Sequence, residues 1–225
     1  MPPPSERSVR QQIEDYSSFR RRIEVFSGEE QDALDWAYQI AKSAHRSQVR
    51  QSGERYFEHP RAVFNILFDE CAVRDSGILI IALLHDVCED TAIFGNPTKM
   101  PYSLWQEKAR KRLAMNFGNT VANDVLSLAE PTVEGIEITS KNKSEEIYHV
   151  KLKSASSRAL VVKMADRLHN LRTLKAVSAE KRINKIKETE DIYLPLFASS
   201  SMEFPETRDI LLSNIQKVIT ELKSS

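Results

Sequence analysis

The fold is decided by the stretch Ile-Leu-Ile-Ile-Ala-Leu-Leu-His-Asp-Val-Cys-Glu-Asp at residues 78–90. Its first part, Ile78 to Val87, is apolar on almost every side, which predicts either a buried helix or a buried strand. The run Ala82-Leu83-Leu84 favours a helix. A helix that is apolar all round must be covered on every side, so we expect it at the centre of the domain.

Outward from this stretch, the pattern predicts helices on both sides. One begins at Ser27-Gly28-Glu29-Glu30 and runs to about Ser47, and the next begins at His59-Pro60, where proline suits the first turn. Further helical patterns cover 103–117, 118–129, 142–155, 158–176, 178–197 and 206–223. Residues 92–102 and 131–139 are predicted loops. We therefore expect an all-α bundle of about eight to ten helices without a substantial sheet, with a domain at 29–225 and an N-terminal extension at 1–28.

The composition excludes several classes of protein. The 225 residues contain 32 basic and 32 acidic side chains, without the basic surplus that is typical of nucleic-acid binding. The N-terminus lacks the apolar stretch of a signal peptide, and the longest apolar run is too short to cross a bilayer. We therefore expect a cytoplasmic protein that has no membrane or nucleic-acid partner. Its two cysteines, Cys71 and Cys88, are expected to be reduced and buried.

His85 and Asp86 form the first candidate for chemistry. They follow the most apolar helix, and polar groups at the end of a buried helix need partners, which a divalent cation would supply to both. Glu89 and Asp90 lie one helical turn beyond them. This spacing predicts metal ligands first and proton-handling carboxylates next to them.

A second candidate lies in the segment Val161 to Leu174. Asp166 follows an apolar stretch there, as a distant further ligand would. The segment alone is equally compatible with an exposed carboxylate that pairs with Arg167 or Asn170.

Several motifs together resemble a known family, the hydrolase domain of RelA/SpoT-type enzymes, and more closely the free-standing small alarmone hydrolases of the HD superfamily. The resemblance runs from about Ala41 to Leu196. The matching pieces are Ala44-His45 with Gln48, Arg50, Ser52-Gly53-Glu54 and Tyr56; His59-Pro60; Ala82 to Val87 with Glu89-Asp90-Thr91; Ala165 to Leu174; and Glu188-Thr189 with Ile192-Tyr193 and Pro195-Leu196.

This resemblance implies a Mn²⁺-dependent enzyme that cuts the 3′-diphosphate from ppGpp or pppGpp, releasing pyrophosphate and GDP or GTP. It implies that Glu89 and Asp90 handle the attacking water. The implied metal ligands are His59, His85, Asp86 and Asp166. The implied contacts to the nucleotide are Arg50, Ser52, Asn170 and Thr173, with Lys185 facing the phosphates. Imidazole and carboxylate ligands also suit iron or zinc.

The other histidines receive different interpretations. His45 is expected to be a core or supporting histidine, because His59 fits the family's ligand position better. His169 is expected to be structural. His149 has no partner in sequence and is expected to be exposed.

The sequence departs from the family pattern in loops that would contact the substrate. Gln51 stands where a basic residue is common, Arg55 replaces a proline, Ala129-Glu130-Pro131-Thr132 replaces a Gly-Val-Thr stretch, and the 92–102 loop is longer. Three functions therefore stay open: hydrolysis of guanosine alarmones, hydrolysis of a related nucleotide such as an adenosine alarmone or NADPH, and nucleotide sensing without catalysis. The oligomeric state is not indicated by the sequence.

Overall fold

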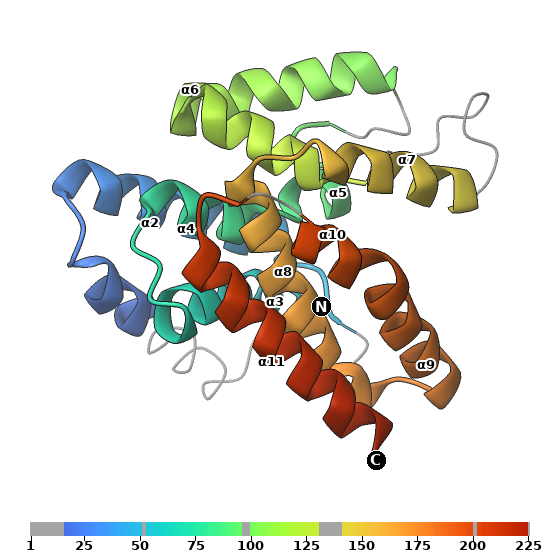
Figure 1. The fold of residues 1–225 in the computed structure, drawn as a ribbon. Helices are drawn as coiled ribbons and strands as arrows, with labels where there is room; N and C mark the ends of the chain where they lie inside the picture. The colour runs from blue at the N-terminus through green and yellow to red at the C-terminus, as the bar shows by residue number, and fades with distance from the viewer. Residues whose placement is uncertain (1–15, 51–52, 96–99, 131–140, 200–201, 225) are drawn as a thin grey trace.

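The secondary structure of the described residues is helical. The computed structural model describes residues 16–50, 53–95, 100–130, 141–199 and 202–224 (Figure 1). Within these ranges no strand is formed, and a single antiparallel bridge joins Val49 to Arg55. The predicted all-α fold is confirmed. Within the same ranges, no helix is long and apolar enough to cross a membrane.

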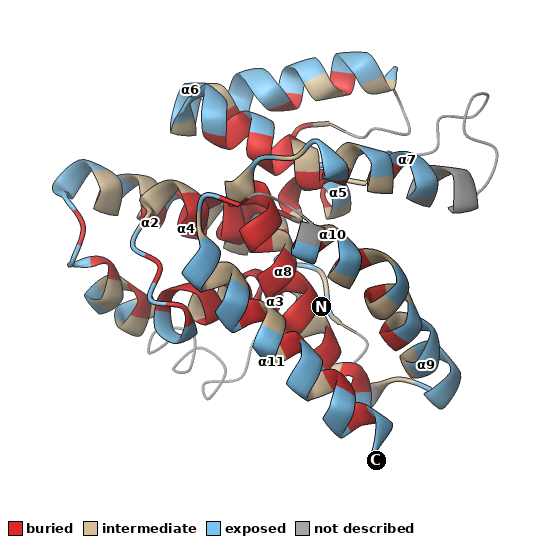
Figure 2. Ribbon diagram, viewed as in Figure 1, coloured by how far each residue is buried: buried red, intermediate tan, exposed pale blue. Residues whose placement is uncertain are grey.

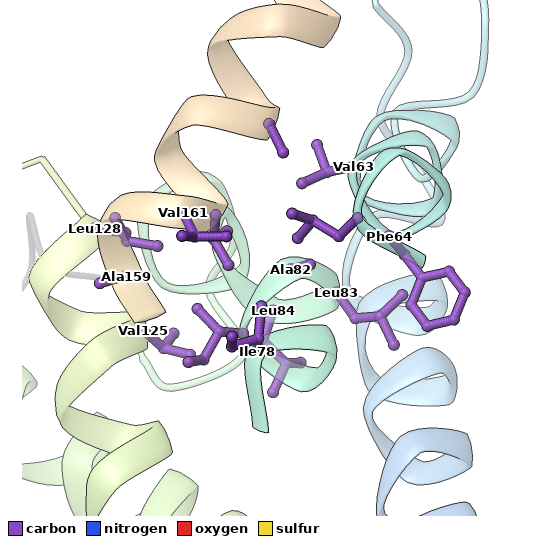
Figure 3. Packing of buried hydrophobic residues seen from close by; sticks show 14 of the residues in the cluster. Val63, Phe64, Ile78, Ala82, Leu83, Leu84, Val125, Leu128, Ala159 and Val161 are labelled. Carbon is purple, nitrogen blue, oxygen red and sulfur yellow. The ribbon is translucent and has the colours of Figure 1, made fainter. Parts of the chain in front are cut away.

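Helix α4, Ser76–Leu84, is the centre of the fold, as its composition predicts. Asp75 begins the helix, because its side chain accepts a hydrogen bond from the backbone N–H of Ile78. Every residue from Ile78 to Leu84 is buried, and burial of each leucine or isoleucine contributes about 1.5–3 kcal/mol. The helices packed against α4 are α2 (Gly28–Ala44), α3 (Glu58–Asn65), α6 (Tyr102–Leu128) and α8 (Ser157–Arg172). Figure 3 shows Val63 and Phe64 on one side of α4 and Val161 and Val125 on the other.

The chain turns at the end of α4. The predicted apolar helix over 78–87 stops at Leu84, and α5 (Val87–Asp90) begins after His85 and Asp86. The backbone N–H of Asp90 donates to the carbonyl of Asp86, so the second turn keeps helical hydrogen bonding. The two polar residues therefore lie at the junction of two helices, with Glu89 and Asp90 in the short helix that follows.

The N-terminal segment packs against the core from residue 16 onward. A helical segment at residues 16–23 buries Phe19 and Ile23, and the ring of Phe19 stacks on Tyr38 of α2. Part of the predicted 1–28 extension is thus integrated into the core. The boundary at residue 28 stays a prediction, and residues 1–15 lie outside the described residues.

A second layer lies above α4 in Figure 1 and consists of α5, α6 and α7 (Lys141–Lys153). Helix α6 bends at Gly118, whose φ of 82° is strained for residues with a side chain. The two patterns predicted at 103–117 and 118–129 meet at this bend. Helix α7 is attached to the end of α6, because the Tyr148 hydroxyl donates to the carbonyl of Leu128. The predicted loop at 131–139 lies outside the described residues.

The C-terminal part of the chain returns along α8. Helix α11 (Pro205–Lys223) runs beside α8, and Figure 2 shows that the buried residues of both helices face inward. The remaining elements are the 3-10 turn Leu174–Ala176, α9 (Ala179–Glu188), the π-helical turn Thr189–Tyr193 and α10 (Leu194–Ser199). The sequence predicts one helix over 178–197, whereas the structure widens it at Thr189–Tyr193, where the N–H of Leu194 donates to the carbonyl of Thr189, five residues back. A second π-helical turn, Ile66–Glu70, follows α3.

Candidate metal centre and adjoining pocket

The structure brings together the four residues that are predicted to bind a metal. His59 lies in the first turn of α3, His85 and Asp86 at the junction of α4 and α5, and Asp166 in α8. The Nε2 atom of His59 is 3.2 Å from Nε2 of His85, 3.3 Å from Oδ2 of Asp86 and 3.1 Å from Oδ1 of Asp166. We call His59, His85, Asp86 and Asp166 the four-residue cluster. Ligation of a metal by this cluster stays a prediction.

Other groups orient the cluster from behind. The Nδ1 atom of His85 is 2.8 Å from the carbonyl oxygen of Ala82, which accepts its hydrogen and leaves a lone pair on Nε2. Asp166 accepts a hydrogen bond from the Asn170 amide at 2.6 Å, and its other oxygen is 2.9 Å from Nζ of Lys163. Two imidazole nitrogens and two carboxylates therefore face one another inside the protein. This donor set fits manganese, iron or zinc.

The electrostatics of the four-residue cluster also favour a cation. Burial opposes protonation of His85, but Asp86 and Asp166 outweigh it and raise the pKa of His85 to about 9. Burial likewise opposes ionisation of the two carboxyl groups. The pKa of Asp86 is nevertheless lowered by His85 and His59, and that of Asp166 by Lys163 and His59. A proton on His85 can thus supply a positive charge within the cluster. A metal ion that bound there would displace this proton.

His169 contacts a member of the four-residue cluster directly. Its Nδ1 atom is 2.7 Å from Nδ1 of His59. Burial, together with the neighbouring His59 and Arg50, lowers the pKa of His169 to about 3, so its ring is neutral. His169 therefore fixes the ring orientation of His59, which is more specific than the structural role expected from the sequence.

The other two histidines differ from each other in burial. His45 is buried, as expected, and its ring stacks on Tyr56 at 4.7 Å. The expectation that His149 is exposed is wrong. His149 is half-buried, lines the pocket and packs edge-on against Tyr193. Sequence could not show this, because the contact comes from the π-helical turn, a distant segment.

The two adjacent carboxylates, Glu89 and Asp90, have different surroundings. Glu89 lines the pocket, and one of its oxygens accepts a hydrogen bond of 2.9 Å from the backbone N–H of Glu130. Although the side chain of Glu89 keeps an exposed surface, desolvation by the surrounding protein raises its pKa to about 7, and the charges of Asp86 and Asp90 act in the same direction. Asp90 instead accepts a hydrogen bond from the Tyr56 hydroxyl, and burial also raises its pKa.

A pocket of about 490 Å³ opens beside the four-residue cluster. Of the residues that the resemblance assigns to nucleotide binding, Arg50, Asn170, Thr173 and Lys185 line it. Ser52 lies outside the described residues. Five basic side chains line the pocket, and we call them the cationic wall: Arg50, Lys163, Arg167, Lys181 and Lys185. A pocket with this lining suits an anionic ligand such as a polyphosphate.

Two guanidinium groups of the cationic wall have spare hydrogen-bonding capacity. Arg50 donates to the side-chain oxygen of Asn170 at 2.9 Å, while its Nη1 atom is buried and has no partner among the described residues. Arg167 lies 3.8 Å from the centre of the Tyr193 ring and 3.2 Å from Glu188, and its Nε atom is likewise without a described partner. Buried donors without a partner are costly, so they point to an acceptor that is supplied by a ligand.

Sequence reasoning missed Lys163, Arg167, Tyr56 and Tyr193 as residues of the site. A signal existed for the first two, because Lys163 precedes Asp166 by three residues on the same helical face and Arg167 follows it directly. Tyr56 and Tyr193 reach the pocket from distant segments, and no local pattern shows that.

Comparisons with known proteins identify relatives of this chain. The family model of the HD domain matches residues 37–201. A GTP pyrophosphokinase rsh of Brucella melitensis is 35% identical over 186 residues, which are 81% of this chain and 22% of the relative. A GTP pyrophosphokinase of Streptomyces coelicolor is 34% identical over 164 residues, which are 72% of this chain and 17% of the relative. The chain thus spans about a fifth of the length of these curated relatives.

A solved structure shares the fold. It is described as "A metazoan ortholog of SpoT hydrolyzes ppGpp and plays a role in starvation responses" and superposes with a TM-score of 0.63 at 24% identity. The match covers 87% of this chain and 96% of the solved one.

Proposed function

The chain belongs to the HD-domain family, and from that premise we propose that it is a metal-dependent phosphohydrolase of guanosine alarmones. It would remove the 3′-diphosphate of ppGpp or pppGpp and release pyrophosphate with GDP or GTP. One observation carries the proposal: a cluster of two imidazoles and two carboxylates, of which only Asp86 is partly exposed, lies beside a pocket with a cationic wall. That combination suits a divalent ion beside a polyphosphate.

The relatives add support for this substrate. Two GTP pyrophosphokinases align with most of this chain, and the solved structure of the same fold is described as hydrolysing ppGpp. We propose that the site binds a small molecule. We also propose that the protein acts in the cytoplasm. Mn²⁺ is our proposal for the ion because the resemblance to the RelA/SpoT-type hydrolases implies it; the imidazole and carboxylate donors suit iron or zinc as well.

The residues of the site would divide the work. His59, His85, Asp86 and Asp166 would hold the ion, which supplies Lewis-acid activation of water and neutralises charge on the phosphoryl oxygens. Arg50, Asn170 and Thr173 would contact the nucleotide, and Lys185 would face its phosphates. Glu89 lines the pocket, and its pKa of about 7 suits proton transfer at neutral pH.

The proposed reaction is a displacement at phosphorus. The oxygen of water joins the phosphorus nearest to the ribose, and one of its protons passes to Glu89. The bond between this phosphorus and the 3′ oxygen breaks. The 3′ oxygen takes up a proton and becomes a hydroxyl, so that pyrophosphate and GDP or GTP are released.

The test is a nucleotide panel with the purified chain and Mn²⁺, resolved by ion-exchange chromatography. We expect pyrophosphate and GDP from ppGpp, and loss of turnover after chelation that is restored by added Mn²⁺. The Asp86→Asn variant serves as the control for contaminating hydrolases. Faster turnover of an adenosine alarmone, or release of a single phosphate from NADPH, would show that this compound is the substrate in place of the guanosine alarmone. Binding without turnover of any nucleotide would indicate a sensing module instead.

A further inference from the structure

Glu89 and Asp90, the two carboxylates in α5, are adjacent in sequence but have different surroundings. Glu89 is among the residues that line the pocket, whereas Asp90 is not among the described lining. The side chain of Asp90 turns instead toward Tyr56, which approaches from the segment before α3. Only one member of the pair can therefore meet a ligand in the pocket directly.

Tyr56 stands between Asp90 and a residue of the four-residue cluster. Its hydroxyl oxygen is within hydrogen-bonding distance of the Asp90 carboxylate and lies 3.0 Å from Oδ2 of Asp86. A phenol has a single hydrogen to donate, so it can fully satisfy only one of these acceptors at a time. Asp86 already faces Nε2 of His85 at 3.1 Å and Nε2 of His59 at 3.3 Å, while Asp90 depends on the phenol.

The surroundings of the Tyr56 ring hold it in this position. One face stacks on the buried ring of His45, at 4.7 Å and 17° between the planes, and an edge contact of 6.2 Å reaches His59. The guanidinium of Arg50 lies 6.0 Å from the ring centre. The backbone N–H of Tyr56 donates to the carbonyl of Gln48 at 3.0 Å. A ring packed in this way has little freedom to turn its hydroxyl elsewhere.

Gln48 completes the arrangement from the other side. Its side-chain amide donates to the backbone carbonyl of Asp90, and its oxygen lies 2.6 Å from Nδ1 of His45. Asp90 is thus held twice, at its backbone by Gln48 and at its carboxylate by Tyr56. Both of these residues also contact His45, so the four side chains form one connected unit.

We propose that Tyr56 is a positioning residue which holds Asp90 against Asp86 and outside the pocket, so that Glu89 alone of the acidic pair reaches the substrate and its water. This inference rests on the proposed function where it concerns turnover. Asp90 then acts through Tyr56 and Asp86 on the shape of the four-residue cluster, and Glu89 carries the proton. Substitutions of Asp90 and of Glu89 should therefore impair turnover in different ways.

A double-mutant cycle with the full chain, Mn²⁺ and ppGpp tests this division. Loss of one hydrogen bond to a charged group in Tyr56→Phe should lower kcat about tenfold and leave KM within about twofold. Asp90→Asn should give a similar loss, and the double variant should be no worse than the worse single variant, since both changes weaken the same hydrogen bond: one removes its donor and the other removes the charge of its acceptor. The effects of Tyr56→Phe and Glu89→Gln should multiply. Multiplication of the Tyr56→Phe and Asp90→Asn effects would overturn the proposal.

The matched control is Tyr16→Phe, which removes a hydroxyl that donates to Asp35 at 2.8 Å; neither residue is among those that line the pocket. We expect it to leave kcat and KM unchanged. Calorimetric titration with Mn²⁺ should show that Tyr56→Phe still binds the ion, with an affinity lowered by no more than about tenfold, because Tyr56 would not ligate the ion itself and only donates toward Asp86. Loss of Mn²⁺ binding in Tyr56→Phe would show a structural role in the metal site and would also overturn the proposal.

A measurement without turnover separates this inference from the proposed function. Tyrosine labelled with ¹³C at Cζ gives one signal for each of the six tyrosines, and Tyr56→Phe identifies the one of interest. Asp90→Asn should shift this signal, while Glu89→Gln should leave it in place. The same result is expected if the unmodified chain hydrolyses no nucleotide, which would defeat the proposed function alone. If the Tyr56 signal shifted in Glu89→Gln and not in Asp90→Asn, the proposed contact between Tyr56 and Asp90 would be contradicted.

Discussion

The four-residue cluster and the cationic wall lie in one pocket, yet their side chains are held in different ways. In the cluster, His85 is fixed by the carbonyl of Ala82, and Asp166 by Asn170 and Lys163. In the wall, buried nitrogens of Arg50 and Arg167 have no partner among the described residues. The cluster would be completed by a small cation, as we propose, whereas the two guanidinium nitrogens of the wall would be completed by the acceptors of a larger ligand.

This difference shows how the two regions should respond to change. Groups that are oriented by the protein hold a fixed geometry, so removal of one should eliminate the chemistry rather than weaken binding. Donors that await a ligand contribute mainly when it is bound, so their removal should raise KM. The following substitutions test this contrast, beginning with the largest expected effect.

Asp86→Asn should have the largest effect, because it removes a charged ligand and keeps the size of the side chain. We expect hydrolysis to fall by at least about a thousandfold, together with a loss of Mn²⁺ affinity of about a hundredfold. Calorimetry measures the affinity, and circular dichroism checks that the helices persist. Unchanged Mn²⁺ affinity would remove Asp86 from the metal site.

Glu89→Gln should lower kcat by about a hundredfold while Mn²⁺ stays bound. Because burial raises the pKa of Glu89 to about 7, the ionised base is lost as the pH falls below that value. The kcat/KM of the unmodified chain should therefore decline toward acidic pH from about 7, and the variant should lack this decline. The same pH profile in both proteins would assign the decline to another group.

Arg50→Met tests the wall at a guanidinium group whose buried Nη1 atom has no partner among the described residues. Loss of a charged hydrogen bond to the ligand should raise KM about thirtyfold with kcat within about threefold. Arg46→Met is the matched control, since Arg46 is exposed in the same segment and is not among the pocket-lining residues. A fall in kcat without a change in KM would place Arg50 with the cluster instead.

Lys185→Met should give the smallest effect. Lys185 lines the pocket, but its side chain is 45% exposed and its Nζ is already 2.7 Å from Glu188. A screened and partly exposed charge contributes little, so we expect KM to rise about threefold. Lys187→Met, on the exposed side of the same helix, should leave KM unchanged. An effect as large as that of Arg50→Met would show that Glu188 releases Lys185 to the ligand.

The helices were largely predictable because their signals are local. The apolar run before His85 predicts the central helix, and Ser27 with Glu30 predicts the start of α2, where the structure shows a capping box. The break between α4 and α5 at His85 and Asp86 was not predicted, since the spacing led us to expect Glu89 and Asp90 one regular helical turn beyond them. The two π-helical turns were missed for a related reason, because one extra residue in a helix leaves no mark on composition.

The candidate site was predictable only in part. His85, Asp86, Glu89 and Asp90 could be singled out from local spacing, whereas His59 was assigned through the family resemblance. The roles of Tyr56 and His169 depend on which side chains meet across the fold. His169 and His59 are separated by 110 positions, and such a contact is set by the packing of α3 against α8 rather than by either segment.

The π-helical turn at Thr189–Tyr193 has a consequence for changes in chain length. A wide turn places residues five apart on one side, and here it lets Glu188 and Tyr193 both contact Arg167. Deleting one residue there would restore ordinary helical spacing and rotate the aromatic ring by about 100° away from its guanidinium partner. This segment should therefore tolerate many replacements but no shortening, so that here the number of residues matters more than their identity.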